Sequence, residues 1–109
     1  MKRFVWVLIG IAIGCHGGGT DDLVGATCRD SRDCVERCER GGDFPDGFCT
    51  IGCIDDRDCP SDTACTDTHG RVCLFPCRDQ RDCDFLGPRY GCREKRDPFN
   101  AILFVCMGN

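Results

Sequence analysis

Cysteine is the residue type that offers the most chemistry here, because 13 of the 109 residues are Cys. In a chain this short, such a density is typical of a disulfide scaffold. Zinc sites and thiol–disulfide exchange sites favour Cys-x-x-Cys pairs, and the sequence contains none. We therefore predict no metal, no cofactor and twelve structural disulfide cysteines: Cys28, Cys34, Cys38, Cys49, Cys53, Cys59, Cys65, Cys73, Cys77, Cys83, Cys92 and Cys106.

Charged residues between the cysteines repeat at a fixed spacing. The pattern Cys-x-Asp-x-Arg-Asp-Cys begins at Cys28, Cys53 and Cys77, so its copies start 25 and 24 residues apart. Its charged positions are Asp30, Arg32, Asp33, Asp55, Arg57, Asp58, Asp79, Arg81 and Asp82. This agreement indicates three tandem copies of one unit, over residues 28–52, 53–76 and 77–109.

The paired carboxylates of this motif raise the possibility of a calcium site. Calcium needs six to eight oxygen ligands, but the chain lacks an Asp-x-Asp-x-Asp-Gly loop. The Arg between the two carboxylates would also oppose a cation. We favour a local Arg–Asp pair combined with a turn cap, and keep calcium binding as an alternative.

Residues for nucleophilic catalysis are scarce. The only serines are Ser31 and Ser61, and the only histidines are His16 and His69. A catalytic triad needs a shaped pocket on a rigid scaffold, for which a short, loop-rich chain leaves little room. We interpret His69-Gly70 as a turn and predict no catalytic residues and no enzyme activity.

Each repeat continues with a third Cys, a polar stretch of turn residues, and an apolar step into a fourth Cys. Turn residues between short β-prone segments predict a hairpin, with strands near the third and fourth cysteines. Four cysteines allow three connectivities. We favour first-to-third and second-to-fourth, giving Cys28–Cys38, Cys34–Cys49 and their equivalents, because interleaved bridges would pin both the loop and the hairpin.

Two local predictions refine this picture. The continuous apolar run from Ala101 to Cys106 is the clearest strand, and we expect it to be the most buried segment. The Asp before each second Cys (Asp33, Asp58, Asp82) is expected to cap one helical turn, with Glu36 at capping-box spacing from Asp33. The predicted fold class is small and disulfide-rich, loop-rich with short β-hairpins.

Composition explains why cross-links are needed and restricts the partners. Only 15 of the 82 residues from Cys28 onward are Leu, Ile, Val or Phe, about 18%, which is too few for an ordinary hydrophobic core. The formal charge of −4 becomes −6 without residues 1–14, which contain Lys2 and Arg3. An acidic chain argues against nucleic acid and against electrostatic adsorption to anionic lipid.

The first residues are typical of an export signal. Lys2 and Arg3 precede a ten-residue apolar run, which is too short to span a bilayer and suits a signal peptide. The run ends in Ala12-Ile13-Gly14-Cys15, which resembles the lipobox of bacterial lipoproteins. That resemblance implies cleavage of residues 1–14 and lipidation of Cys15, and the even number of remaining cysteines agrees. Simple secretion, with cleavage after the small residues, and an uncleaved apolar anchor are the alternatives.

The following residues, 15–27, are Gly-rich and predict a flexible tether between the lipidated Cys15 and a cysteine-rich domain over 28–109. His16 takes the position at which some lineages place an Asp to retain lipoproteins in the inner membrane. Its presence there favours the outer membrane or the cell surface.

Tandem Cys-x5-Cys units with an Asp before the second Cys, behind a lipobox, resemble cysteine-rich bacterial lipoproteins. The segment 59–65 (CPSDTAC) also looks like an element of dickkopf-type and whey-acidic-type secreted modules. Whey-acidic modules carry adjacent cysteines and EGF modules carry Cys-x-Cys, both absent here. No inhibitor or growth-factor function is therefore transferred.

These observations predict an exported, lipid-anchored surface protein that acts as a non-enzymatic structural or interaction module. Its expected partners are the membrane, through the lipid, and a protein or glycan. Two alternatives stay open. One is a small protease inhibitor using Arg40 or Arg71 in a loop, and the other is a calcium-dependent adhesion module.

Overall fold

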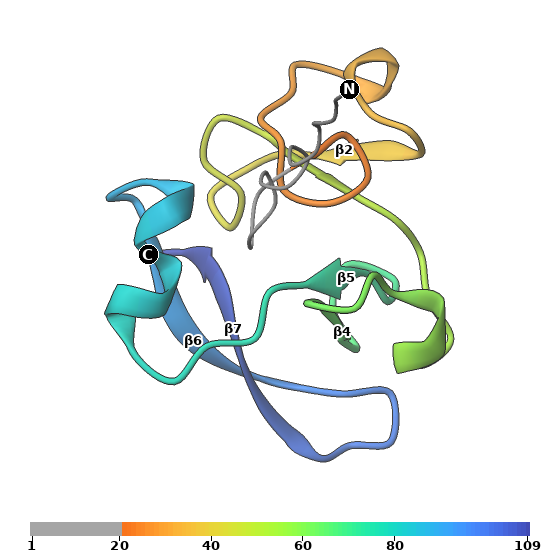
Figure 1. The fold of residues 1–109 in the computed structure, drawn as a ribbon, viewed down its shortest axis with the longest axis vertical. Coiled ribbons are helices and arrows are strands. Elements are labelled where there is room, and N and C mark those ends of the chain that lie inside the picture. Colours follow the sequence, from red (N-terminus) through yellow and green to blue (C-terminus); the bar gives the residue numbers. More distant parts are fainter. Residues whose placement is uncertain (1–20) are drawn as a thin grey trace, which may run out of the picture.

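A computed structural model describes residues 21–109 of the protein (Figure 1). The predicted signal peptide, Cys15 and His16 lie outside these residues. No helix in the described part is long and apolar enough to cross a membrane.

Each repeat consists of a short 3-10 helix followed by an antiparallel hairpin. The elements of repeat 1 are η2 (Ser31–Asp33), β2 (Arg37–Glu39) and β3 (Phe48–Thr50). Those of repeat 2 are η3 (Asp56–Asp58), β4 (Ala64–Cys65) and β5 (Cys73–Leu74). Those of repeat 3 are η4 (Gln80–Leu86), β6 (Tyr90–Arg96) and β7 (Ile102–Gly108). The predicted fold class and hairpin positions are confirmed.

The third and fourth cysteines of every repeat lie directly opposite each other in the hairpin, as Cys38↔Cys49, Cys65↔Cys73 and Cys92↔Cys106. They do not bond to each other. Each bonds back to the segment that carries the 3-10 helix, so the bridges are Cys28–Cys38, Cys34–Cys49, Cys53–Cys65, Cys59–Cys73, Cys77–Cys92 and Cys83–Cys106. The favoured first-to-third and second-to-fourth pairing is confirmed in all three repeats.

Backbone hydrogen bonds join each repeat to the next in the same way. The N–H of Cys73 donates to the Ile51 carbonyl at 3.1 Å, and the N–H of Cys106 donates to the Phe75 carbonyl at 2.9 Å. Ile51 and Phe75 each lie two residues after a fourth Cys, so the two contacts are equivalent. We call residues 51–53 and 75–77, which connect one repeat to the next, the linkers. Each linker thereby adds a short third strand to the hairpin of the following repeat.

Residues 21–27 occupy the equivalent position in front of repeat 1. The N–H of Cys49 donates to the Ala26 carbonyl at 2.9 Å, and the N–H of Gly25 donates back to the Cys49 carbonyl at 2.8 Å. Val24 is buried in the common core. The prediction of a flexible tether is therefore wrong for residues 21–27, because they supply the strand that linkers supply elsewhere.

One hydrophobic core serves all three repeats, which surround it in Figure 1. Its centre is Phe48, which is fully buried and lies beside an aromatic ring from each repeat. The ring centroids are 5.4 Å away for Phe44, 6.2 Å for Phe75 and 6.1 Å for Tyr90. Because the core is shared, the repeats form one domain rather than an open row of independent units.

The C-terminal residues close this arrangement against repeat 1. The N–H of Gly108 donates to the Asp43 carbonyl at 2.7 Å, and the Tyr90 hydroxyl donates to the Pro45 carbonyl at 3.2 Å. Gly108 lies two residues after the fourth Cys of repeat 3, at the position that Ile51 and Phe75 occupy in repeats 1 and 2. Those two residues pair with the following repeat, whereas Gly108 packs on the first repeat.

The expectation that the segment from Ala101 to Cys106 is the most buried is wrong. Ala101, Ile102 and Phe104 are exposed, and only the second half of β7, from Val105 onward, is buried. The cause is that the hairpin extends beyond the core, so side chains in the second half of β6 and the first half of β7 alternate between exposed and partly buried positions.

We predict that Gly108→Ala destabilises the protein by about 1–3 kcal/mol, because a Cβ at this position would overlap the Gly42 carbonyl oxygen and crowd the ring of Pro45. Gly42→Ala is the matched control, since a Cβ there meets nothing nearby. Denaturant unfolding of both variants measures the difference. Equal stability of the two would contradict the closing contact between repeats 3 and 1.

Candidate functional site

The repeated charged motif was the strongest candidate site in the sequence, and its first Asp caps the 3-10 helix. Asp30, Asp55 and Asp79 have extended backbones, and each carboxylate accepts the N–H of the Arg two residues on, at 2.9, 2.9 and 3.0 Å. A short acidic side chain in this position satisfies a donor that has no partner within the helix. The prediction that Asp33, Asp58 and Asp82 are the caps is therefore wrong by three residues.

The second Asp of the motif sits inside the turn and reaches backward. Its carboxylate accepts the N–H of the residue after the first Cys, with donors Arg29, Ile54 and Arg78 at 2.8, 2.7 and 2.7 Å. In repeats 1 and 2 the helical turn thus precedes the second Cys instead of following it, whereas η4 of repeat 3 begins before Cys83 and continues past it to Leu86. Glu36 caps nothing there, since it accepts the N–H of Gly52 at 2.8 Å.

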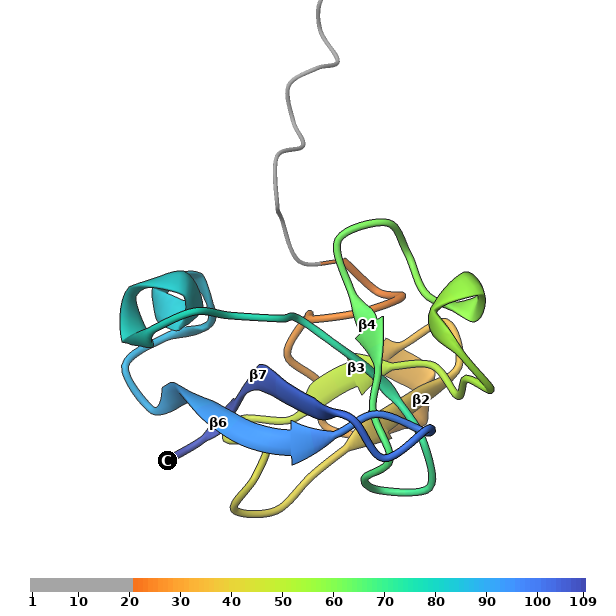
Figure 2. The ribbon, with the colours of Figure 1, turned by 90° about the horizontal axis from the view of Figure 1, so that it is seen from below.

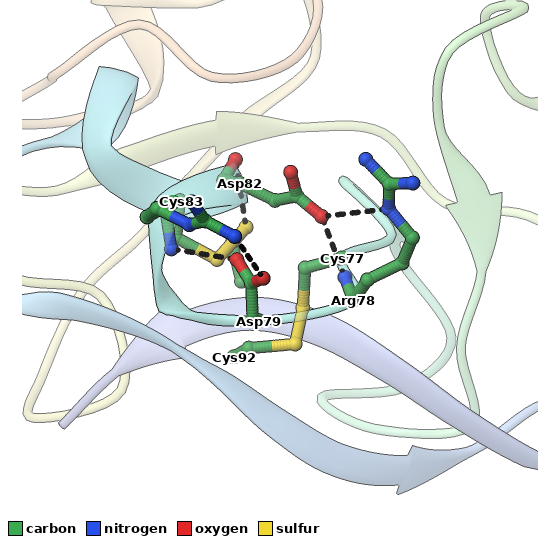
Figure 3. Close-up of polar contacts among 8 residues, drawn as sticks. Cys77, Arg78, Asp79, Asp82, Cys83 and Cys92 are labelled. Carbon is green, nitrogen blue, oxygen red and sulfur yellow. Dashed lines mark hydrogen bonds and ion pairs between the residues drawn. A yellow bond between two sulfur atoms is a disulfide. The ribbon is translucent and has the colours of Figure 1, made fainter.

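The Arg of the motif folds back on the first Asp, as we predicted. Arg32, Arg57 and Arg81 pair with their carboxylates at 2.9, 2.8 and 3.2 Å, and their side chains stay 86–91% exposed. Figure 3 shows the third copy, in which Arg78 also pairs with Asp82 at 3.3 Å. All five recurring positions therefore have a structural role, two as disulfides and three as charges that hold the loop.

Hydrogen bonds lower the pKa of three of the motif carboxylates, Asp30, Asp55 and Asp82. The guanidinium of Arg32 lowers the pKa of Asp30, and that of Arg57 lowers the pKa of Asp55. For Asp82, the hydrogen bond from the backbone N–H of Arg78 is the main cause of a lowered pKa. The same donors occupy the oxygens that a calcium ion would need, so the motif's geometry favours the turn cap.

Three sulfur clusters accompany the motifs. In each repeat, three cysteine sulfurs lie within 4.8 Å of one another, in the sets Cys28/Cys34/Cys38, Cys53/Cys59/Cys65 and Cys77/Cys83/Cys106. Every one of these sulfurs belongs to a disulfide, which leaves no thiolate to bind a metal. The clusters are the points at which the two bridges of a repeat pass each other.

A second charged cluster, which sequence reasoning missed, joins all three repeats. His69 lies in the β4–β5 turn, with Nε2 3.1 Å from Asp43 Oδ2 and Nδ1 3.7 Å from Glu39 Oε1. Asp43 also binds Arg93 of repeat 3 at 2.9 Å. The hydrogen bond to His69 is the main cause of the lowered pKa of Asp43, with Arg93 contributing. The turn at His69-Gly70 is confirmed, but no local signal reveals partners 26 and 30 residues away.

The two arginines considered for protease inhibition are both engaged. The Arg40 guanidinium donates to the Arg29 carbonyl at 2.7 Å, and Arg71 lies 3.6 Å from Asp67. Arg71 also has a φ of 71°, which is left-handed rather than extended. A loop that binds like a substrate needs an extended backbone and a free side chain, and neither residue offers both.

Comparison with protein-family models, curated proteins and solved structures finds no match for this chain. Its class is therefore defined by its own structure: a small disulfide-rich domain of three stapled repeats.

We predict that Asp55→Ala lowers the melting temperature by a few degrees, on the order of 5 °C, because it removes the cap of η3. Asp55→Ser should retain most of the stability, since a hydroxyl also accepts the Arg57 N–H. Asp62→Ala is the control, as Asp62 is exposed and makes no ion pair among residues 21–109. Thermal unfolding distinguishes the three variants, and equal effects of the two alanines would remove the structural role of the motif.

Acid should weaken the protein through the carboxylates whose pKa is lowered. A carboxylate with a folded-state pKa below its ordinary value of 3.8 stabilises the fold above that pH, and the contribution disappears as the pH falls through the folded-state value. We expect Asp43→Asn to be less stable than wild type at pH 7, and we expect this difference to shrink as the pH is lowered to 2. Denaturant titrations at both pH values test this, and a deficit that does not shrink in acid would contradict it.

Proposed function

We propose that this protein is an exported bacterial lipoprotein whose domain acts as a non-enzymatic interaction module on the cell surface. The observation that carries the proposal is the complete pairing of twelve cysteines within residues 28–106. Disulfides in such number persist only in oxidising compartments. Cys15, the thirteenth, has no partner left among them, which fits a sulfur reserved for lipid attachment.

The use of the polar side chains supports a binding role over a catalytic one. The motif carboxylates accept backbone N–H groups, and the ring nitrogens of His69 face Glu39 and Asp43. A catalytic histidine would instead need one nitrogen free for a nucleophile or a substrate. Ser61, the serine of the same repeat, is not among the partners of His69.

A stapled scaffold is suited to displaying side chains rigidly. The disulfides and the motif hydrogen bonds fix the loops before any partner arrives, which reduces the entropy lost on binding. Repeat proteins commonly bind through faces built from equivalent positions. Calcium-dependent adhesion and protease inhibition have no comparable support. The motif carboxylates already accept hydrogen bonds, and Arg40 and Arg71 are already paired within the molecule.

The test is the intact mass of the protein from the membrane fraction, before and after reduction with alkylation. We expect loss of residues 1–14, a lipid-sized increment on Cys15, and twelve thiols that appear only after reduction. Cys15→Ser is the matched control, which should lose the increment and keep all twelve protected thiols. Free thiols in the unreduced wild type, or an unmodified Cys15, would overturn the proposal.

A further inference from the structure

The third hairpin extends well beyond its two cysteines. Its facing cysteines, Cys92 and Cys106, which bond back to Cys77 and Cys83, lie near the base, and the strands continue beyond them to the turn at 97–101. The hairpins of repeats 1 and 2 are only three and two residue pairs long. We call residues 93–105 the arm.

The outer face of the arm carries large apolar side chains in solvent. Phe99 at the turn is 76% exposed, and Ile102 and Phe104 on β7 are 55% and 46% exposed. Ile102 and Phe104 project to the same side, because they are two residues apart on one strand. We call these three residues the arm surface. Repeats 1 and 2 each have a single exposed large apolar residue, Val35 and Ile54.

The arm is held firmly although it extends from the core. The N–H of Asp67 donates to the Arg96 carbonyl at 2.8 Å, and the N–H of Cys77 donates to the Phe104 carbonyl at 2.9 Å. At the turn, the Asp97 carboxylate accepts the N–H groups of Phe99 and Ala101 at 2.8 and 2.9 Å. The exposed rings are therefore presented at little further cost in conformational entropy.

The border of the arm surface is acidic. A cleft of about 270 Å³ separates Phe99 from η3 of repeat 2, and its walls are Asp55, Asp56, Arg57, Asp97, Pro98 and Phe99. Asp55 and Arg57 neutralise each other at 2.8 Å, which leaves the charges of Asp56 and Asp97. Glu94, exposed and directly opposite Phe104 across the hairpin, adds a third carboxylate. Arg96, opposite Ile102, is the single positive charge among these outward positions.

The arm also lies far from the start of the described chain. Residues 21–27 are on the upper side of the molecule in Figure 1, and the turn of the arm is at the bottom. Figure 2 gives the same separation from a second direction, with the arm running across the lower side. The point at which the described chain begins and the turn of the arm therefore lie on different sides of the domain.

We propose that the arm surface is the docking site of the module, and that it binds a protein surface on which apolar side chains are bordered by Lys or Arg. Phe99, Ile102 and Phe104 supply the apolar contact, and aromatic side chains of this kind often dominate binding energy. The cleft accepts a basic side chain against Asp56, Asp97 and the Phe99 ring. This inference rests on the proposed function, because it names the surface through which that module acts.

An exposed apolar face could also bind a second copy of the protein or a lipid surface, and charge favours a basic protein partner over both. A second copy docking symmetrically would bring its own acidic border against this one. Anionic lipid would meet the same carboxylates, on a described chain whose net charge is −6. A basic partner is attracted by both the border and the overall charge.

The probe is an amphipathic helical peptide with leucines on one face and lysines around them. The protein is the exported chain carrying Cys15→Ser, so the assay is independent of lipid attachment and its failure leaves the mass test standing. Isothermal titration should show binding that weakens about tenfold or more in the variant Phe99→Ser, Ile102→Thr, Phe104→Thr. The control Val35→Thr, Ile54→Thr removes equally exposed apolar residues and should bind like wild type.

Three further measurements keep the proposal open to failure. A peptide with glutamate in place of lysine, and one with serine in place of leucine, should each bind at least about tenfold more weakly. Glu94→Lys, which leaves the apolar residues intact, should weaken the lysine peptide even if the triple variant unfolds. Three results would overturn the proposal: an equal loss of binding in the Val35/Ile54 control, a concentration-dependent dimer, or preferential binding to phosphatidylglycerol vesicles.

Discussion

The fold depends on two crossed disulfides in each repeat. The third and fourth cysteines face each other across a hairpin, yet each bonds to the preceding loop, so a single 3-10 segment is fastened to both strands. Hairpins of two or three residue pairs are marginal in water by themselves. The disulfides restrict the unfolded chain enough for such short hairpins to persist, and the small core around Phe48 then orients the repeats.

Electrostatics in this protein serves mainly to shape the loops. Each motif carboxylate accepts backbone N–H groups that the short 3-10 turn leaves without partners, and the Arg between them secures the first carboxylate. The His69 cluster applies the same chemistry between repeats. These charges are engaged within the molecule, and the largest group of exposed apolar side chains lies on the arm, beside the carboxylates that border it.

The structural unit of each repeat includes residues outside the segment that its four cysteines define. Linkers 51–53 and 75–77 pair with the next hairpin, and residues 24–26 make the equivalent pairing with repeat 1. The last linker position, Gly108, packs on repeat 1 and closes the set. Such contacts could not be predicted from the sequence, because a Gly-rich polar stretch such as 16–27 has the same composition whether it is a tether or an added strand.

Spacing and residue type by themselves determined the three repeats, the disulfide class, the hairpins around the third and fourth cysteines, and the Arg–Asp pairing, because each of these is encoded within about 25 residues of chain. The local pattern predicted an Asp cap for each 3-10 helix but placed it three residues too late. Each motif contains two aspartates, and residue type alone does not show which of them is the cap. Tertiary structure alone decided the shared core, the closure at Gly108, the His69 cluster and which half of β7 is buried. These depend on residues far apart in the chain meeting in space, and a local pattern carries no record of that meeting.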